Sequence, residues 1–478
     1  MGAKDSISAT GAPRLLFWSF AGLTLLSFFA AVATNRYFLF GAPAALILAY
    51  LCIVDFKKIY YLLWAFIPLS TEVFLPGGFA TDLPDEPFMV LLAGVFLIFL
   101  IRNGRELDKR FFVHPVTLLL YLHLAWLTVT MITSSLPLVS VKFLLAKAWY
   151  VLTFYFLTGF LLKKEEDTKK WFWWVFIPLM ATVAYVFLRH ASLGFSFKDV
   201  NQAMAPFYRN HVNYACLLAL FFPLAWFART WYKPLSFPWL ILVGSAVFLL
   251  AAIQVAYTRA AYVALAIAAG AYFIVRLRLV LPALLLALIG AIGAVGYLVH
   301  QEKYLEYAPD FEKTVTHYKF DNLLAATAKG EDISTMERVY RWVAGKHMIQ
   351  DRPLTGFGPG NFYNFYRSYT VSSFETYVSD NPEQSGIHSY YLMTAVEQGI
   401  PGLLIFVGMA FAVLIFGQRV YHRTRDPFRK RWVMAIILGT IVIDSLLLIN
   451  DMVETDKVGS FFFLFMAMLV RMDLEDQG

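Results

Sequence analysis

The chain has 478 residues, of which 59% are hydrophobic and 15% are charged, with a mean hydropathy of +0.61 and a formal net charge of +7. A soluble domain carries roughly 25% charged residues, so this composition excludes an ordinary soluble globular protein. The positive charge is not a sign of nucleic-acid binding, because basic residues on the cytoplasmic loops of a membrane protein produce the same excess. We therefore expect membrane lipids as surroundings and no nucleic-acid partner.

The first apolar run covers residues 15–33 and follows Lys4 and Arg14. Its last residues, Ala31-Val32-Ala33, resemble a signal-peptide cleavage site. A signal-peptide core has about 7–15 apolar residues, and this run is longer. The run therefore predicts a first transmembrane helix.

Apolar runs of about 17–22 residues recur along the chain, which is the length needed to cross a bilayer as a helix. They predict an all-α polytopic integral membrane protein with about 12–14 transmembrane helices. The range reflects two short runs, 59–74 and 88–101. The predicted spans are residues 15–34, 37–54, 59–74, 88–101, 116–133, 140–162, 171–188, 211–228, 237–257, 260–276, 279–299, 390–417, 432–449 and 458–471.

The charges of the loops predict the orientation of the chain in the membrane. If the spans alternate, the basic loops, such as 102–110, 163–170 and 422–431, fall on one side, which the positive-inside rule assigns to the cytoplasm. Both termini lie on that side. The long segment 300–387 and the loop 189–210 fall on the opposite side. This predicts a bacterial inner (cytoplasmic) membrane protein whose active site faces the periplasm.

Three parts follow from this division: an N-terminal transmembrane bundle (1–299), a mainly helical periplasmic domain (300–387) and C-terminal transmembrane helices that complete the bundle (388–478). With fewer than 90 residues and no cysteine, the periplasmic part is expected to pack on the membrane part. Neither Cys52 nor Cys216 is expected to form a disulfide, since both lie in apolar runs.

Local patterns predict the structure of the periplasmic segment. The segment Ser334-Thr335-Met336-Glu337 fits a capping box at the start of a helix. Asp351-Arg352-Pro353 ends that helix, because proline cannot continue it. Gly356-Phe357-Gly358-Pro359-Gly360 predicts a tight turn, and residues 361–369 predict a second short helix.

Arginines lie at the outer ends of spans, where the positive-inside rule does not expect them. The apolar stretch 237–276 is twice the length of one span, so it predicts a helical hairpin with Tyr257-Thr258-Arg259-Ala260 at its outer turn. Arg259 there is either an arginine that snorkels to the interface or an anion-binding residue at the mouth of a cavity. Arg209 poses the same choice between a flanking charge and a ligand-binding residue.

Other basic residues lie on the same side. Lys142 can snorkel, whereas Lys147 lies one and a half turns deeper, some 7–8 Å further along a helix, and is harder to explain as a flanking charge. Arg338 and Arg341 lie one turn apart on the predicted capped helix, where a solvated face is the alternative to a supporting role in binding.

His388 opens a transmembrane helix on the side of these cations and is followed by Tyr390, Tyr391 and Glu397. A lone histidine is often only a hydrogen-bonded structural residue, but this position favours a functional one. Glu397 is about 13 Å further along the helix, too far to contact His388 directly, and its alternative role is as a buried polar partner of another helix.

Together these residues predict a cation-rich mouth above a lipid-lined interior, which suits a ligand with an anionic head and an apolar tail, such as a polyprenyl diphosphate. No zinc-ligand spacing, phosphate-binding loop or Ser/His/Asp signature is present. Asp82 and Asp85 lie in a proline-rich turn and do not indicate a metal site. We therefore expect no metal and no cofactor.

A resemblance to the O-antigen ligase family covers roughly residues 200–415. It rests on Tyr208-Arg209-Asn210-His211, on Thr258-Arg259-Ala260, on Arg341-Trp342 and the stretch from Asp351-Arg352-Pro353 to Gly358, and on His388-Ser389-Tyr390-Tyr391-Leu392 with Glu397-Gln398-Gly399. The resemblance implies an inner-membrane glycosyltransferase of Gram-negative bacteria, usually with twelve spans, that needs neither metal nor nucleotide. The donor would be O-antigen on undecaprenyl diphosphate, and the acceptor the lipid A–core.

The functional arginines and histidine of that family correspond to Arg209, Arg259 and His388 in this sequence. On this interpretation Arg209 and Arg259, with Lys147, bind the donor diphosphate. Lys142, Arg338, Arg341 and Tyr391 would support the site. His388 would activate the acceptor hydroxyl in a single displacement with inversion at the anomeric carbon, and fixed cations would replace a metal at the leaving diphosphate.

Other functions remain open at this stage. An O-antigen polymerase or a protein O-oligosaccharyltransferase of the same superfamily shares these features. A lipid-linked oligosaccharide flippase or other transporter would favour broken helices at mid-membrane and a repeated half-structure. A structural scaffold would leave the one-sided cations unexplained.

Overall fold

The computed structural model describes residues 11–75, 79–308, 332–376, 379–381 and 385–475, and these residues are almost entirely helical. The all-α prediction is confirmed. Contacts divide the chain into two compact units, Met1–Leu63 and Trp64–Gly478. In the first unit, α1 (Gly11–Thr34) and α2 (Ala42–Val54) are joined by a short 3₁₀ turn, and α3 (Phe56–Phe66) contains the boundary between the units.

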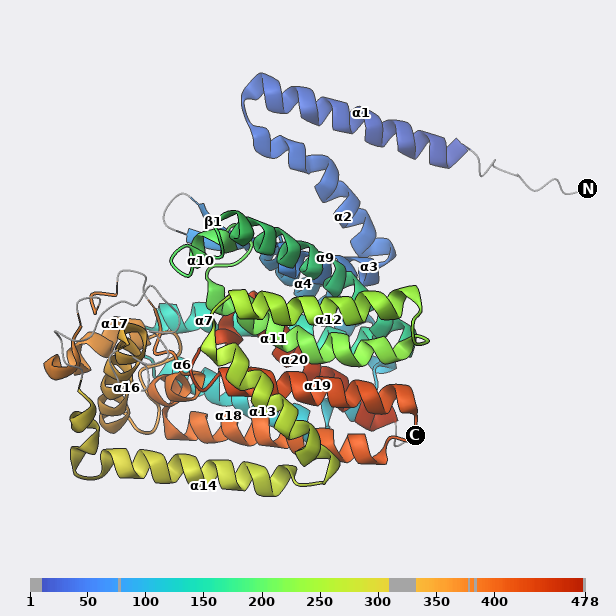
Figure 1. The fold of residues 1–478 in the computed structure, drawn as a ribbon. Helices are drawn as coiled ribbons and strands as arrows, with labels where there is room; N and C mark the ends of the chain where they lie inside the picture. The colour runs from blue at the N-terminus through green and yellow to red at the C-terminus, as the bar shows by residue number, and fades with distance from the viewer. Residues whose placement is uncertain (1–10, 76–78, 309–331, 377–378, 382–384, 476–478) are drawn as a thin grey trace, which may run out of the picture. The chain divides into compact units, whose positions relative to one another are not determined.

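The second unit contains the remaining elements (Figure 1). Its N-terminal part consists of β1 (Thr71–Leu75), β2 (Phe79–Leu83), α4 (Asp85–Asn103), α5 (Lys109–Phe112), α6 (Pro115–Ile132), α7 (Pro137–Tyr150), the π-helical turn Val151–Leu157, α8 (Thr158–Leu161), α9 (Glu165–Ser192), α10 (Val200–Met204) and α11 (His211–Ala228). Its C-terminal part consists of α12 (Phe237–Val255), α13 (Arg259–Arg276), α14 (Val280–Val299), α16 (Ile333–Asp351), α17 (Phe362–Phe365), α18 (Tyr390–Arg423), α19 (Pro427–Leu446) and α20 (Asp456–Glu475).

Eight helices among the described residues are long and apolar enough to cross a membrane. They are Pro115–Ile132, Pro137–Leu161, Glu165–Ser192, His211–Trp231, Phe237–Val255, Arg259–Arg276, Val280–Glu306 and Tyr390–Arg423. Helices of 19–24 residues, α1, α4, α19 and α20, also coincide with predicted spans. The chain is thus a multi-pass membrane protein, and the total of 12–14 crossings stays a prediction.

One predicted span is wrong in its second half. Residues 59–74 were expected to form one apolar helix, but α3 ends at Phe66 and residues 71–75 form β1. β1 pairs with β2 as an antiparallel hairpin, in register from Thr71 opposite Leu83 to Leu75 opposite Phe79. Thr71 and Val73 are β-branched, and Pro68 interrupts the helix before them, which favours a strand over a helical ending.

The connections of the second unit gather at two opposite ends of the helix bundle, as the alternation of spans predicts. The hairpin, α10, α16 and α17 lie at one end, and the α18–α19 connection and the C-terminus lie at the other (Figure 1). Contacts agree, because Arg423 bonds Asp473 and His422 bonds the Val275 carbonyl at 2.8 Å. We call the end that carries α16 and α17 the outer end.

The centre of the second unit is formed by helices that are buried on all sides. α20 buries nearly every side chain and α11 buries two thirds of its residues, and α19 packs between α11, α13 and α18. Trp64, Trp171 and Phe461 meet edge to face or tilted at the centre of the bundle. These helices and aromatic side chains form the closely packed core of the second unit.

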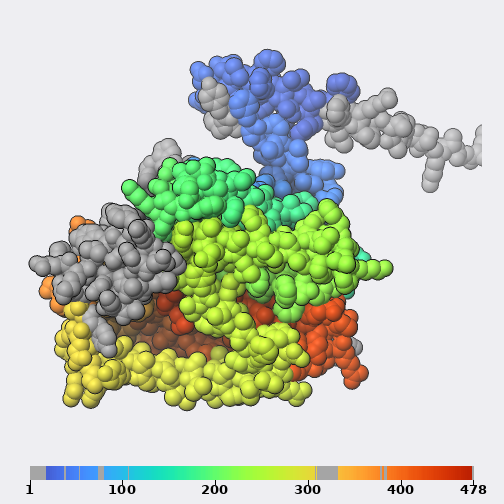
Figure 2. Space-filling model, viewed as in Figure 1, coloured from blue at the N-terminus to red at the C-terminus, as the bar shows by residue number. Residues whose placement is uncertain are grey.

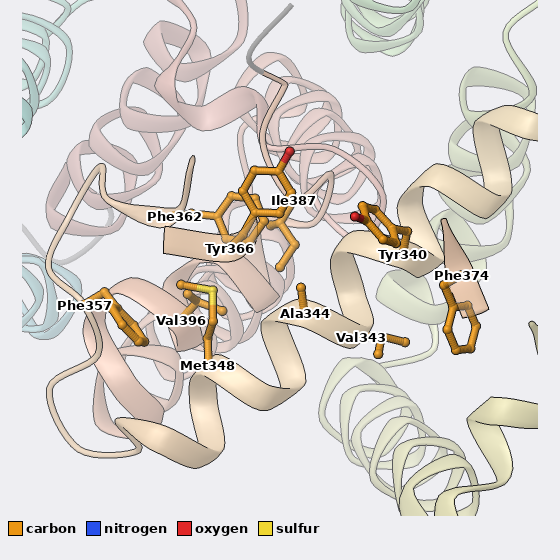
Figure 3. Close-up of a cluster of buried hydrophobic side chains, with 10 residues drawn as sticks. All are labelled: Tyr340, Val343, Ala344, Met348, Phe357, Phe362, Tyr366, Phe374, Ile387 and Val396. Atoms are coloured by element: carbon orange, nitrogen blue, oxygen red, sulfur yellow. The ribbon is translucent and has the colours of Figure 1, made fainter. Parts of the chain in front are cut away.

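The outer segment 332–387 has a hydrophobic cluster of its own, drawn in Figure 3. Its buried members come from α16, the glycine-rich turn, α17 and the 3₁₀ turns after it, the segment before α18, and α18 itself. They are Tyr340, Val343, Ala344, Met348, Phe357, Phe362, Tyr366, Phe374, Ile387 and Val396. Because Val396 belongs to α18, the cluster joins the outer segment to the membrane helices. The segment therefore packs on the membrane part, as its small size predicts.

The structure corrects one local prediction for this segment and confirms two. The helix start is corrected by two residues: the N-cap of α16 is Asp332, whose carboxylate accepts the Thr335 N–H at 3.1 Å, and not Ser334. The end of α16 at Asp351 and the turn at Gly356–Gly360 are confirmed. Aspartate competes better than serine here because its charge also favours the positive end of the helix dipole.

Helix α18 is broken one third of the way along, and the glycine-rich turn fits into the break. Gly399 has φ 72°. The backbone N–H of the next residue, Ile400, donates to the Pro353 carbonyl at 2.8 Å. Phe357 and Gly358 donate to the carbonyls of Val396 and Glu397 at 3.0 and 2.9 Å. The break thus exposes backbone groups of α18, which bond the turn that follows α16.

Substituting alanine for Gly399 is expected to destabilise the protein by roughly 1–3 kcal/mol, because alanine is strained at positive φ. The added methyl group would also overlap the Leu354 carbonyl, a backbone atom that cannot move aside easily. The measurement is the midpoint of thermal unfolding in detergent. Gly408→Ala, in the same helix with open space around the position, is the control and is expected to be neutral. Equal midpoints for the two variants would contradict this explanation of the break.

Candidate active site

His388 lies at the outer end, directly before the N-cap of α18, in the left-handed backbone region that few residues other than glycine adopt. Its φ is 57°, in the left-handed region, where only a few per cent of non-glycine residues lie and where asparagine, aspartate and histidine are the most frequent of them. Strained residues of this kind persist only where the surroundings hold them, and they cluster at functional sites. The conformation is the first sign that His388 is placed for a purpose other than packing.

The residues on both sides of His388 are held by hydrogen bonds. The Ile387 carbonyl accepts the Trp342 indole N–H at 3.0 Å. Ser389 caps α18, and the Tyr390 N–H donates to the carbonyls of Leu447 at 2.9 Å and Asn450 at 3.1 Å. These bonds fix the backbone of His388 between α16 and the α19–α20 connection.

Two arginines of α16 surround His388 with positive charge. Burial, followed by the charges of Arg338 and Arg341, lowers the pKa of His388 to about 3. The imidazole is therefore neutral at physiological pH, so it has a free nitrogen lone pair that can accept a proton or a hydrogen bond.

Arg341 is almost completely buried, with 6% of its side chain exposed. One Nη donates to Glu337 at 3.3 Å, and Glu337 in turn accepts from the hydroxyls of Thr376 and Ser379. The Nε of Arg341 has no hydrogen-bond partner among the described residues. The buried network thus fixes the guanidinium while leaving one donor available.

Arg338, one turn earlier, donates to the Ser334 carbonyl and hydroxyl at 3.1 and 2.8 Å. Its Nε is buried and also lacks a partner within the described part of the chain. Burial and the nearby charge of Arg259 lower the pKa of Arg338, and Arg341 adds to this effect. Cations gathered in this way are stabilised by an anion.

Arg259 begins α13 directly after the predicted hairpin turn, which is confirmed by the end of α12 at Val255 and by the cap at Thr258. Its Nη2 donates to Asp332 at 3.0 Å, and Asp332 is 1% exposed. The pair connects the α12–α13 hairpin to the start of α16. Nη1 of Arg259 is buried and has no partner in the described ranges, so Arg259 combines an anchoring contact with one free donor.

Arg209 lies in the short link between α10 and α11 and is exposed. It makes no hydrogen bond or ion pair with any described residue, but its charge acts on Asp451, which also lies near Arg341. The structure therefore brings Arg209, Arg259, Arg338 and Arg341 into one neighbourhood, which we call the arginine cluster. They come from three separate parts of the chain.

Lys147 is buried in α7 and is paired with Glu454. Only 2% of its side chain is exposed, and its Nζ donates to Glu454 at 2.5 Å. The ring of Tyr390 is 5.8 Å from Nζ, and the Tyr390 hydroxyl donates to the same Glu454 oxygen at 2.7 Å. This geometry favours a role in which Lys147 holds Glu454 and Tyr390 beneath the site over direct binding of a ligand.

The other predicted supporting residues differ in position. Lys142 is exposed on α7, with no hydrogen bond to a described residue. Tyr391, the second residue of α18, donates a hydrogen bond from its hydroxyl to the Asp444 carbonyl at 3.4 Å and packs against Phe406. Neither side chain is drawn into the arginine cluster by a described contact.

Glu397 is the buried polar partner that the sequence left as an alternative. Its carboxylate accepts the backbone N–H groups of Gly360 at 2.9 Å and Phe362 at 3.0 Å. It thereby holds the glycine-rich turn in the break of α18, which in turn sets the direction of α16 and its arginines.

Asp451 is the acidic residue of this site that sequence reasoning missed. It lies in the α19–α20 connection, and its Oδ2 packs so closely on Gly386 that a side chain there would overlap it. The pKa of Asp451 is raised, chiefly by burial and also by Glu454, while its own N–H and the charges of Arg341 and Arg209 oppose the rise. The signal in the sequence was an acidic residue beside the polar Asn450 in an outer loop.

The acidic residues of the hairpin lie elsewhere at the outer end. Asp85 is fully buried near Asp456, and Asp456 accepts the Ser70 hydroxyl at 2.8 Å. Lys457 donates to Ser70 and lies close to Asp456, at 4.0 Å. Within the described residues, no group of three or more His, Cys, Asp or Glu side chains is arranged to hold a metal ion.

The geometry is that of an anion site made of arginine side chains, with a neutral histidine beside it. The family model described as O-antigen ligase matches residues 244–407. That range includes Arg259, α16, the glycine-rich turn and His388, and Arg209 lies outside it. A search of curated proteins returned no match.

Proposed function

Because the chain belongs to the O-antigen ligase family, we propose that it is a membrane glycosyltransferase that moves O-antigen from undecaprenyl diphosphate to the lipid A–core at the periplasmic face. The single observation that supports this most is the arginine cluster beside a neutral His388. Arg259, Arg338 and Arg341 each have one buried N–H group without a hydrogen-bond partner among the described residues. Such groups suit the oxygens of a diphosphate, because one guanidinium can bind two oxygens at once.

The reaction proposed is a single displacement. The arginine cluster holds the diphosphate and neutralises the charge that grows on it as the bond from the anomeric carbon to the phosphate oxygen breaks. The acceptor hydroxyl attacks from the opposite face, and His388 takes up its proton, so the product has inverted configuration. The leaving polyprenyl diphosphate keeps the bonding electron pair and needs no acid.

Electrostatics suggests that the donor activates the base. In the free protein the pKa of His388 is about 3, which makes the imidazole a weak base. A bound diphosphate would offset the charges of Arg338 and Arg341, which raises the pKa of His388 towards its ordinary value. Transfer would therefore follow donor binding, and the site would be inactive without it.

The helices around the site suit a lipid-linked substrate. Of the side chains in α14, only Val280 is buried, although Val280 also ties the helix to α18 through Gln418 at 3.0 Å. Figure 2 shows a recess between α13 and α14 with atoms of the C-terminal helices at its back. A polyprenyl tail could lie against such an apolar surface while its diphosphate reaches the outer end.

The alternative functions differ in acceptor. An O-antigen polymerase would use a second lipid-linked glycan, and a protein O-oligosaccharyltransferase would use a hydroxyl of a protein. The test is transfer by the purified protein from a lipid-linked glycan to lipid A–core, to a second lipid-linked glycan or to a protein. Consumption of lipid A–core supports the ligase, and consumption of another acceptor identifies the alternative. No transfer to any of them would favour a transporter.

Metal independence is a prediction of this mechanism. Activity is expected to remain within about twofold of its starting value in excess chelator, because fixed arginines supply the charge stabilisation that a divalent cation gives other enzymes. Initial rates of transfer with and without EDTA measure this. Loss of activity that magnesium or manganese restores would show that the diphosphate site has been misassigned.

A further inference from the structure

His211 is the first residue of α11, and its backbone is joined to the start of α13. The Thr258 hydroxyl donates to the His211 carbonyl at 3.3 Å, and Thr258 directly precedes Arg259. Arg209 stands two positions before His211 in the chain. The backbone that carries His211 therefore lies between the stretches that carry two members of the arginine cluster.

A short helix and an aromatic ring hold the imidazole of His211 in place. Asn201, on α10, accepts two hydrogen bonds through its Oδ1, one from the backbone N–H of His211 at 3.0 Å and one from the ring Nδ1 at 2.7 Å. The ring of Phe197 meets the imidazole edge to face, with 6.4 Å between the ring centroids. Tyr257 packs on Phe197 in turn and donates its hydroxyl to the Phe195 carbonyl at 2.8 Å. The orientation of the imidazole is thus set from α10 and from the turn before α13.

The contact with Asn201 also decides which ring nitrogen of His211 carries a hydrogen. A backbone N–H can only donate, so the side-chain atom of Asn201 that it meets is the oxygen. The ring Nδ1 faces the same oxygen and must therefore carry a hydrogen. In the neutral ring Nε2 then keeps its lone pair and can accept a hydrogen bond. No described residue makes a hydrogen bond to Nε2.

The arginines limit what the Nε2 of His211 can bind. Positive charges nearby disfavour a further charge on the imidazole, so Nε2 is offered as an acceptor. The oxygens of a diphosphate are acceptors as well and gain nothing from it, and a polyprenyl chain has no polar hydrogen. In a glycosyl donor the hydrogen-bond donors next to the diphosphate are the hydroxyl groups of the first sugar.

We propose, resting on the function proposed above, that the Nε2 of His211 accepts a hydrogen bond from a hydroxyl of the sugar attached to the donor diphosphate. The arginine cluster holds the diphosphate, and this second contact fixes the sugar, so that its anomeric carbon faces the attacking hydroxyl. The same bond selects among donors, because a first sugar without a hydroxyl at that point leaves the acceptor unpaired. Asn201 is a positioning residue, since it acts through the ring of His211.

Two substitutions of His211 separate the roles of its two ring nitrogens. Asparagine places an N–H where Nδ1 stands and keeps the contact with Asn201 but has no atom at the position of Nε2, whereas glutamine reaches that position with its amide oxygen. His211→Asn is expected to bind the lipid-linked glycan of the transfer assay roughly tenfold more weakly than the wild-type protein, the cost of one lost hydrogen bond. Its kcat/KM should fall at least as far, and His211→Gln should recover part of both.

Farnesyl diphosphate, which has the diphosphate and an isoprenoid chain but no sugar, is the second probe. It is expected to bind with equal affinity to the wild-type protein and to His211→Asn, both purified at full length in detergent. His347→Asn is the matched control, because Nδ1 of His347 bonds the Tyr369 carbonyl at 3.1 Å and an asparagine can keep that bond. This variant should bind both ligands and transfer glycan as the wild-type protein does.

The two probes and the two variants give distinct results. Wild-type glycan binding and transfer by His211→Asn, with a loss in His211→Gln, would make the ring a structural support and overturn its role in binding the sugar. An equal loss of affinity for farnesyl diphosphate and for the glycan in His211→Asn would make the ring a ligand of the diphosphate or a support of the fold, and would overturn that role as well. A wild-type protein that binds neither ligand and transfers no glycan would overturn the proposed function itself, and the role of His211 with it.

Discussion

Replacing Arg209 with alanine is expected to lower the rate of glycan transfer by at least about 100-fold, the usual cost of removing a group that stabilises charge in a transition state. Arg209 makes no bond with a described residue, so the variant should fold normally and unfold at the same temperature as the wild-type protein. Lysine at this position should restore part of the activity, because it keeps the charge but not the paired geometry of a guanidinium.

Arg259→Ala is expected to lose activity to a similar extent but also to unfold at a lower temperature. Its partner Asp332 is 1% exposed and would keep a buried charge without the arginine. The measurements are initial rates with the lipid-linked donor and thermal unfolding in detergent. Arg367→Ala, at an exposed position of the outer segment, is the control and should be active. A wild-type rate in Arg259→Ala would reduce this arginine to an anchor.

Replacing His388 with alanine is expected to lower transfer by about 10²–10⁴-fold, the range that a positioned general base supplies. Binding of the donor should remain, since the arginines that hold the diphosphate are unchanged. His388→Gln can hydrogen-bond but cannot take up the proton, so it should be nearly as impaired. Near-normal turnover by the glutamine variant would show that His388 only orients the acceptor.

The dependence of kcat/KM on pH gives an independent check, because this quantity reports the free protein. With a pKa of about 3, His388 in the free protein stays neutral as the pH falls through 6.5. The kcat/KM of the wild-type protein should therefore not fall near pH 6.5. The contrary result is a fall near pH 6.5 that is present in the wild-type protein and absent from His388→Gln. Such a fall would mean that the imidazole titrates normally and that neither burial nor the charges of Arg338 and Arg341 lower its pKa.

Much of the architecture could be predicted because hydrophobic runs of span length have one stable outcome in a bilayer. A helix satisfies all its backbone hydrogen bonds within itself, so an apolar run such as 237–255 becomes a helix whatever its neighbours are. The hairpin turn at Tyr257–Ala260 followed from length alone. The prediction of a helix over residues 59–74 failed at residues 71–75, because these residues pair with β2 as a strand.

The residues of the site were also partly predictable. Arg209, Arg259 and His388 could be singled out because they stand at the outer ends of apolar runs, where a charged or polar side chain has an energetic cost and often a function. Asp451 could not be singled out, because acidic residues are common in loops on the outer side of a membrane protein. The depth of Lys147 in a span drew attention to it, but its ion pair with Glu454, more than 300 positions away, could not be predicted from the sequence.

By itself the sequence determined that the chain is a helical membrane protein, which loops share a side, and which cations lie near that side, since each of these depends on local composition and length. Only the tertiary structure decided how the cations are used. The glycine-rich turn that follows α16 fits into the break at Gly399 and donates two backbone hydrogen bonds to Glu397, and the charges of Arg338 and Arg341 on α16 act on His388. Such pairings join distant segments through side-chain and backbone geometry, and that geometry exists only once the helices have packed.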